Sequence, residues 1–340
     1  MKFHFSLSEK SPKFKIIVAV LLLFVAFCAI SAVRDISGAG GDNTGIYIEI
    51  RSGETLSEIT GELYSNGIIK HKKLFSAFAK GKYNTFQYGG HIFTTAMSYG
   101  EICNQLSEVG TSRNARLVIP EGYELRMIAK ACEDVGLVSV DAFMKSADKD
   151  KFDYNFITDK KGTEHRLEGF LFPATYEFPY GTTAHDIIDA MLRAFDNTYT
   201  KEYSKRAAEL GMSDYDIVTL ASVIEREAAD MSEQKRVSGV FYNRIKDGMK
   251  LQSCATVQYI LKERKPVLSV ADTKIDSPYN TYQNSGLPVG PIASPGKSAI
   301  EAALYPESHG YYYFVAKSDG SGHVFSKTYE EHEKAVSQNQ

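Results

Sequence analysis

Residues 213–256 read SDYDIVTLASVIEREAADMSEQKRVSGVFYNRIKDGMKLQSCAT, and this stretch decides the architecture of the second half of the chain. Ser213 is a favourable N-cap residue, and four apolar residues recur after it at helical spacing: Ile217, Leu220, Ala221 and Ile224. A second helix is predicted by Val237, Val240, Phe241 and Ile245, ending at Gly248. Two helices joined by an acidic elbow are typical of a cleft wall. We expect residues 249–259 to line that cleft as a strand or loop.

The Glu-Arg-Glu triplet at 225–227 carries the candidate chemistry. Glu225 and Glu227 are two positions apart, so they project to opposite shoulders of the helix and cannot act as a facing pair. Glu227 is expected to lie over Val223 and Ile224. A carboxyl group among aliphatic side chains loses hydration and keeps its proton more readily, as a general acid must. Glu227 is therefore the predicted general acid; the alternative is two solvated glutamates on an exposed face.

Length and composition predict a globular protein of two to three domains, because the chain has 340 residues, 43% of them hydrophobic and 24% charged. The net charge of −3 and the pI near 6.3 argue against a dedicated nucleic-acid binder, so no nucleic-acid partner is expected.

Residues 16–33, IIVAVLLLFVAFCAISAV, contain no charge and are long enough to cross a membrane as a helix. Four lysines and one glutamate precede them, which predicts a cytoplasmic N-terminus (1–15) and an extracytoplasmic remainder at the cell membrane. The small residues at 29–33 leave a cleavable signal peptide as the alternative. Residues 34–45 then include a glycine-rich segment that predicts a flexible linker.

A strand–turn–helix pattern occurs twice in the first half. Residues 46–50 alternate as a strand before Gly53-Glu54-Thr55-Leu56, and residues 117–119 do so before Glu121-Gly122-Tyr123. The offset of 69 residues between Gly53 and Gly122 indicates a degenerate internal repeat. On its own the pattern predicts only packed strand–helix units.

Two further segments are candidate substrate surfaces. Residues 167–180, LEGFLFPATYEFPY, place five aromatic residues around Glu168 and Glu177. They are equally suited to stacking on sugar rings and to packing beneath the central helix. Residues 279–296 combine tyrosine and asparagine side chains with a Gly/Pro-rich loop, a combination suited to hydroxyl and acetamide groups.

Metal and cofactor chemistry is not expected. The four cysteines have no metal-ligand spacing, and Walker, dinucleotide and zinc-protease motifs are missing. The sequence therefore predicts no cofactor and no metal. Cys254 is left as a thiol of unknown purpose.

Three ordered blocks resemble a known family: LASVIEREAADMSEQKRVSGVFYNRIKDGMKLQS (220–253), DSPYNTYQNSGLPVGPIASPGKSAIEAALYP (276–306) and YYYFVAKSDGSGHVFSKTYEEH (311–332). The chain is similar to the endolytic murein transglycosylases, also called the MltG or YceG-like family, from about residue 45 to 336. The resemblance implies an α+β fold class: an N-terminal transmembrane helix, a LysM-like α/β module (46–115) and a mixed α+β catalytic domain (116–337).

The resemblance also implies site residues. Glu227 matches the family's catalytic acid, and Glu225 its neighbour in a supporting position. Gln252, Asn280, Tyr282, Thr256 and Glu168 match positions expected to bind substrate. Where the family often has Asp-Pro, this chain has Cys254-Ala255, which removes any acid there.

The implied reaction needs one carboxyl group. Glu227 would protonate the glycosidic oxygen of peptidoglycan and then accept the proton of the C6 hydroxyl as a 1,6-anhydro ring closes on N-acetylmuramic acid. Implied partners are peptidoglycan glycan strands, the membrane and peptidoglycan synthases, in termination of nascent strands. Two alternatives remain: a non-catalytic wall-binding scaffold, and a hydrolase that pairs Glu227 with Glu168 or Glu177.

Overall fold

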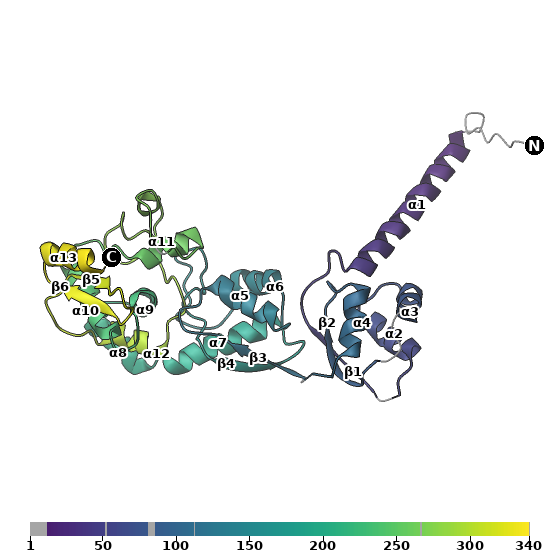
Figure 1. Cartoon of the computed structure of the whole chain (residues 1–340), viewed down its shortest axis with the longest axis horizontal. Helices are drawn as coiled ribbons and strands as arrows, with labels where there is room; N and C mark the ends of the chain where they lie inside the picture. Colours follow the sequence, from purple (N-terminus) through teal and green to yellow (C-terminus); the bar gives the residue numbers. More distant parts are fainter. Residues whose placement is uncertain (1–11, 52, 81–85, 112, 266, 340) are drawn as a thin grey trace, which may run out of the picture. The chain divides into compact units, whose positions relative to one another are not determined.

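The computed structural model describes residues 12–51, 53–80, 86–111, 113–265 and 267–339. Contacts divide the chain into two compact units (Figure 1). Unit 1 comprises Met1–Ala115, Gly136–Ser139 and Pro179–Gly181, and unit 2 comprises Arg116–Val135, Val140–Phe178 and Thr182–Gln340. Most of the predicted cytoplasmic segment, residues 1–11, lies outside the described residues.

Unit 1 begins with α1 (Pro12–Ser37), which contains an apolar span of 22 residues, Ile16–Ser37. The apolar side chains of this span are exposed, as expected for a helix that meets lipid and not a protein core. A single apolar helix near the N-terminus fits a membrane anchor and equally fits a signal sequence.

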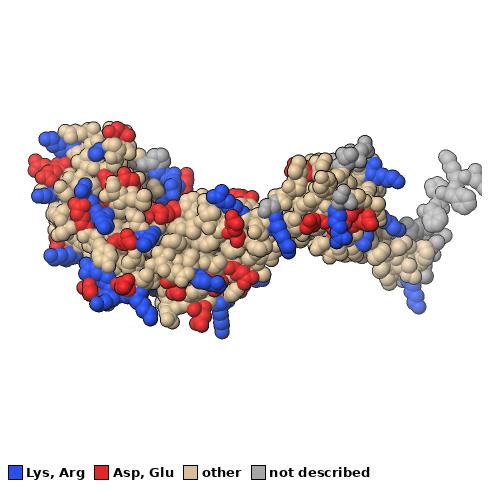
Figure 2. All heavy atoms as spheres, turned by 90° about the horizontal axis from the view of Figure 1, so that it is seen from below, with Lys and Arg blue, Asp and Glu red and all other residues tan. Residues whose placement is uncertain are grey.

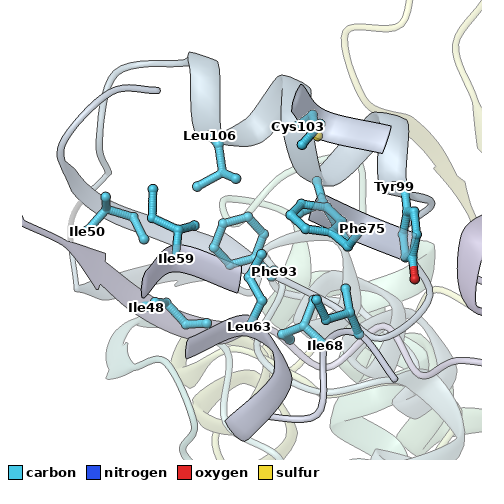
Figure 3. Close-up of a cluster of buried hydrophobic side chains, with 13 residues drawn as sticks. Ile48, Ile50, Ile59, Leu63, Ile68, Phe75, Phe93, Tyr99, Cys103 and Leu106 are labelled. Atoms are coloured by element: carbon cyan, nitrogen blue, oxygen red, sulfur yellow. The ribbon is translucent and has the colours of Figure 1, made fainter. Parts of the chain in front are cut away.

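A small two-stranded sheet and three helices complete unit 1: β1 (Ile46–Ile50), α2 (Leu56–Ser65), α3 (Lys72–Lys80), β2 (Gly89–Phe93) and α4 (Tyr99–Ser107). β1 pairs antiparallel with β2, from Ile46 opposite Phe93 to Ile50 opposite Gly89. Figure 3 shows Phe93 of β2 at the centre of the core, surrounded by apolar side chains from β1 and the three helices. Thr55 and Ser98 begin α2 and α4 with capping boxes. The assignment of this module as LysM-like remains a prediction.

The predicted flexible linker is instead an ordered segment. Gly45 donates its backbone N–H to Gly136 O at 2.7 Å, and Asp42 accepts the Ser139 hydroxyl at 2.7 Å. A Cβ at Gly38 would lie 2.0 Å from the carbonyl oxygen of Ala96. The glycines of this segment therefore permit close backbone contact, and the prediction of flexibility was wrong.

Unit 2 is predominantly helical. Its elements in order are β3 (Asn114–Val118), α5 (Leu125–Asp134), α6 (Val140–Lys149), β4 (Thr175–Pro179), α7 (Ala184–Thr198), α8 (Lys201–Glu209), α9 (Asp214–Glu227), α10 (Gln234–Lys246), α11 (Cys254–Leu261), η2 (Asp272–Lys274), α12 (Lys297–Leu304), β5 (Tyr313–Ala316), β6 (His323–Ser326) and α13 (Tyr329–Asn339). β3 pairs with β4, and β5 with β6 as an antiparallel hairpin. Short sheets among many helices confirm the mixed α+β class.

The central helix of unit 2 is α9, which packs against α8, α10, α11 and α12. Ser213 caps it through a capping box with Asp216. Every residue from 217 to 224 is buried, so the helix is enclosed on all sides and not amphipathic as the sequence suggested. Its polar members are satisfied internally: Ser222 donates to Thr219 O and accepts the Ile292 N–H at 3.0 Å. Glu227, the last residue of α9, is thus fixed by the core of unit 2.

The strand–turn–helix repeat is present as local structure in both copies. Gly53 and Gly122 have positive φ angles of 88° and 76°, a conformation that favours glycine, and α2 and α5 begin just after them. The two copies differ in their partners, because β1 pairs with β2 and β3 with β4.

Candidate active site

Glu227 lines a pocket of about 340 Å³ in unit 2. The lining side chains come from α9, α10, residues 251–252, the start of α11, the segment at Tyr282, β5 and α13. They are Glu227, Arg244, Leu251, Gln252, Cys254, Tyr282, Phe314, Val315, His332 and Val336. Glu227 is the one carboxylate among these lining residues of the described chain. The pocket therefore offers a single acid.

Two donors hold one oxygen of the Glu227 carboxylate. Ser253 donates its hydroxyl to Oε1 at 2.5 Å, and the backbone N–H of Ala255 donates to the same atom at 3.0 Å. Ala255 lies in the first turn of α11, where unpaired N–H groups favour an anion. The predicted aliphatic shoulder is thus replaced by polar contacts. The donors orient the carboxyl group, and Oε2 has no hydrogen-bond partner among the described residues.

The segment that carries Gln252 and Ser253 is held by Thr281. Gln252 N–H donates to Thr281 O at 3.1 Å, and Ser253 N–H donates to Thr281 Oγ1 at 3.0 Å. Gln252 has a φ of 49°, which is unfavourable for a residue with a Cβ and is found where surrounding contacts enforce it. Strain at a pocket-lining residue marks this loop as a candidate functional element.

The residues expected to bind substrate separate into two groups. Gln252 and Tyr282 line the pocket with Glu227, and the Tyr282 hydroxyl lies 3.1 Å from Cys254 Sγ. Thr256 and Asn280 are fully buried behind it. Thr256 donates to Ser253 O at 2.8 Å, and Asn280 donates to Thr273 O and Ile275 O. The structure places these two side chains in the support of the loops and not on the pocket surface.

Glu168 is also away from this pocket. It is 2% exposed, accepts the Leu125 N–H at 3.0 Å at the start of α5, and accepts the Tyr259 hydroxyl at 3.2 Å. Burial raises the pKa of Glu168 to about 8, with a further contribution from the charge of Glu124. Glu168 lines a separate cavity of about 170 Å³.

Glu225 projects away from Glu227, as its spacing predicts. Its Oε2 accepts the backbone N–H of Gly296 at 3.1 Å, at the start of α12. Burial raises the pKa of Glu225 to about 6, the hydrogen bond from Gly296 opposes this, and the charge of Glu121 adds to it. Glu225 therefore contacts the start of α12 and does not line the pocket.

The aromatic segment 167–180 contributes to the core beneath α9. Phe170 is fully buried, and its ring centroid lies 5.3 Å from that of Phe195 and 5.8 Å from that of Tyr215 in α9. Glu177 lies exposed on β4. For Phe170 the packing interpretation is confirmed.

Among the polar residues of the pocket, sequence reasoning missed Arg244 and His332. Arg244 is 7% exposed and donates to Tyr312 O at 2.6 Å and to Leu251 O at 2.7 Å. Its guanidinium carbon lies 5.2 Å from the Tyr313 ring centroid, and the His332 ring stacks on Tyr313 at 5.2 Å. The two side chains thus join α10, β5 and α13 at the pocket.

His332 has an unusual environment, because its Nδ1 is buried and has no hydrogen-bond partner among the described residues. Burial lowers the pKa of His332, and the charge of Arg244 lowers it further. The imidazole is therefore neutral near pH 7. The sequence signal for Arg244 was available, because it lies seven residues after Val237 on the apolar face of α10. His332 carried no such signal.

The model of the YceG-like family matches residues 48–338, which include every element of the pocket. The chain belongs to the YceG-like family. A relative named endolytic murein transglycosylase from Bacillus subtilis (strain 168) is 38% identical over 304 residues, covering 86% of this chain and 84% of the relative. A protein of the same name from Streptococcus pneumoniae serotype 2 is 33% identical over 86% of this chain and 58% of its own length.

A solved YceG-like structure is also similar. The 2.6 Å crystal structure of the putative yceG-like protein lmo1499 from Listeria monocytogenes has a TM-score of 0.61 and 36% sequence identity. The match covers 85% of this chain and 98% of that one. The YceG-like family thus accounts for both units of the chain and not for unit 2 alone.

Proposed function

We propose that this YceG-like protein is an endolytic peptidoglycan lytic transglycosylase and that Glu227 carries its chemistry. The observation that supports this most directly is the pocket with one carboxylate, at the end of a buried helix. The relatives named endolytic murein transglycosylase support the reaction class. A two-carboxylate hydrolase has less support, because Glu168 lines a different cavity and Glu177 lies exposed on β4.

In the proposed mechanism Glu227 acts twice. With Oε1 held by Ser253 and Ala255, the proton on Oε2 passes to the glycosidic oxygen between N-acetylmuramic acid and N-acetylglucosamine. The bond from that oxygen to the anomeric carbon breaks. The carboxylate then takes the proton of the C6 hydroxyl, whose oxygen closes on the same carbon. The product is a 1,6-anhydro end, and no water is consumed.

The remaining pocket residues position the glycan. Gln252 and Tyr282 supply amide and hydroxyl groups at the pocket surface, where they contact sugar hydroxyl and acetamide groups. Arg244 and His332 complete the pocket wall in this proposal, and Arg244 is bonded to Leu251 O just before Gln252. Thr256 and Asn280 act through the loops they support, and Glu168 acts as a neutral buried group that fixes the start of α5. Glu225 supports the α9–α12 contact.

The apolar helix α1 is proposed to be retained as a single-pass anchor, with the N-terminus in the cytoplasm and both units outside. An anchored enzyme reaches glycan close to the membrane. This supports a function in ending nascent strands beside peptidoglycan synthases. The LysM-like module is proposed to lie between anchor and catalytic unit, and its pocket of about 380 Å³ beside Gly53 and Glu54 is a candidate glycan contact.

Digestion of uncrosslinked nascent glycan by the full chain in detergent tests this function, with mass spectrometry of the new ends. Glu227→Gln keeps the side-chain shape and removes the proton donor, and Glu225→Gln is the matched control two positions away. We expect anhydro-muramic ends from the parent and from Glu225→Gln, and none from Glu227→Gln. Reducing ends would indicate a hydrolase, equal cleavage by Glu227→Gln would exclude Glu227, and no cleavage by any protein would favour the scaffold.

A further inference from the structure

The end of α1 is bonded to unit 1 through Asp35. This residue is 8% exposed, and its carboxylate accepts the backbone N–H groups of Lys70 at 2.8 Å and His71 at 2.9 Å and the hydroxyl of Tyr99 at 2.5 Å. Residues 70 and 71 lead directly into α3. The basic sequence Lys70-His71-Lys72-Lys73 is therefore fixed beside the point where the apolar helix ends.

A pocket of about 370 Å³ lies at the same place. It is lined by Arg34, Asp35, residues 38–42, Gly67, Ile68, Lys70 and Thr95. The guanidinium of Arg34 packs over Gly40, because a Cβ there would lie 2.6 Å from Nη2. Glycine at position 40 is thus required for this placement of the cation.

The acidic and basic side chains of this pocket differ in their contacts with the protein. Asp35 has the partners given above, and Asp42 accepts the Thr44 N–H at 2.6 Å and the Ser139 hydroxyl at 2.7 Å. Arg34 and Lys70 have no carboxylate within 4 Å among the described residues. The acids are thus engaged by donors of the protein, while the two cations are available to an external anion.

The first turn of α3 carries an unfavourable pair of charges for a helix. Lys72 and Lys73 are exposed there with no acidic residue in the turn, although a helix N-terminus favours anions. Exposed apolar groups accompany them: Leu74 is 40% exposed, and Tyr64, over whose ring Lys72 lies at 4.5 Å, is 46% exposed. Lysine with exposed tyrosine and leucine is typical of a surface at the membrane–water interface.

We propose that Arg34, Lys70, Lys72 and Lys73 form a binding site for the phosphate groups of anionic membrane lipids, next to the outer end of α1. The inference rests on the retained anchor of the proposed function. Because Arg34 lies in the last turn of α1, at the end of the apolar span, lipid phosphates surround these cations at high local concentration. Binding there fixes the orientation of unit 1 on the membrane surface.

The test uses the full chain in vesicles of phosphatidylcholine, alone or mixed with phosphatidylglycerol. Acylation rates of Lys70, Lys72 and Lys73 are measured by mass spectrometry, with the exposed Lys201 and Lys205 of unit 2 as internal controls. We expect these three lysines to react about fivefold more slowly in the anionic vesicles, with the controls unchanged. Arg34→Gln is expected to reduce the protection of Lys70.

Equal rates in the two vesicle types, or equal slowing of the control lysines, would overturn the site. Soluble glycerophosphate added to the neutral vesicles distinguishes the source of the anion: protection equal to that of the anionic vesicles would assign the site to a free phosphate and overturn the lipid. Cleavage of glycan is assayed on the same samples, so loss of activity with intact protection would contradict only the proposed reaction. Failure of the chain to float with vesicles would overturn the anchor and this site together.

Discussion

The hydroxyl of Ser253 is expected to control the turnover of Glu227. Ser253→Ala removes the donor at 2.5 Å from Oε1 and leaves only the Ala255 N–H to orient the carboxyl group. A hydrogen bond to a charged group contributes about 1.5–3 kcal/mol. If that energy is used to hold the carboxyl group in the transition state, kcat falls about 10- to 100-fold with little change in KM.

Release of anhydro ends over time, measured by mass spectrometry across substrate concentrations, separates kcat from KM. Ser222→Ala is the matched control, because Ser222 is an equally buried serine that bonds Thr219 and Ile292 and does not touch Glu227. The reasoning is refuted if Ser253→Ala stays within about twofold of the parent, or if Ser222→Ala lowers kcat as much.

Three further predictions concern stability and the pocket. The pKa of Glu225 rises from 4.5 to about 6 on folding, so the free energy of unfolding of the parent falls by about 2 kcal/mol as the pH rises from 4.5 to 6. Urea unfolding in detergent should show Glu225→Gln to be more stable than the parent by that amount above pH 6 and equally stable below pH 4.5. Phe170→Ala should cost about 3–5 kcal/mol in the same assay, and an unchanged midpoint would refute its place in the core. Arg244→Gln should lower kcat/KM about tenfold or more through release of Leu251 O, and a rate equal to the parent would exclude Arg244 from the site.

Local sequence signals predicted the helices of unit 2 well where capping and periodicity agree. Ser213 begins α9, and the apolar residues from Val237 to Ile245 lie in α10 as their spacing predicts. The helix α11 was missed, because its first turn, Cys254-Ala255-Thr256, follows a loop that the Thr281 contacts shape. The burial of α9 on all sides was also missed, since it depends on four helices packing around it.

For the candidate site, residue type misled where bonds to the backbone decide. Asparagine and threonine are suited to glycan binding, but Asn280 and Thr256 use their polar atoms on the protein backbone. Their partners lie three to seven residues earlier in the chain, and no spacing rule predicts which backbone groups those segments leave unpaired. His332 could not be found for a related reason: it reaches the pocket only because α13 packs on the β5–β6 hairpin.

Figure 2 shows basic and acidic side chains interspersed on the face it draws. The local exception is the basic start of α3, where the described residues supply no compensating acid for Lys72 and Lys73. A feature that helix stability disfavours is best explained by a ligand outside the chain, and the proposed ligand is the phosphate group of a membrane lipid.

Glu227, like Lys72 and Lys73, lies at a helix end that disfavours its charge. A carboxylate at the last residue of α9 faces the negative end of that helix, which helix stability alone disfavours. Its Oε1 also accepts an N–H from the first turn of α11, the positive end of a second helix. The Glu227 carboxyl group thus lies where the C-terminal end of α9 meets the first turn of α11. In the proposed reaction the contact with α11 fixes Oε1 and so orients the carboxyl group toward the glycan.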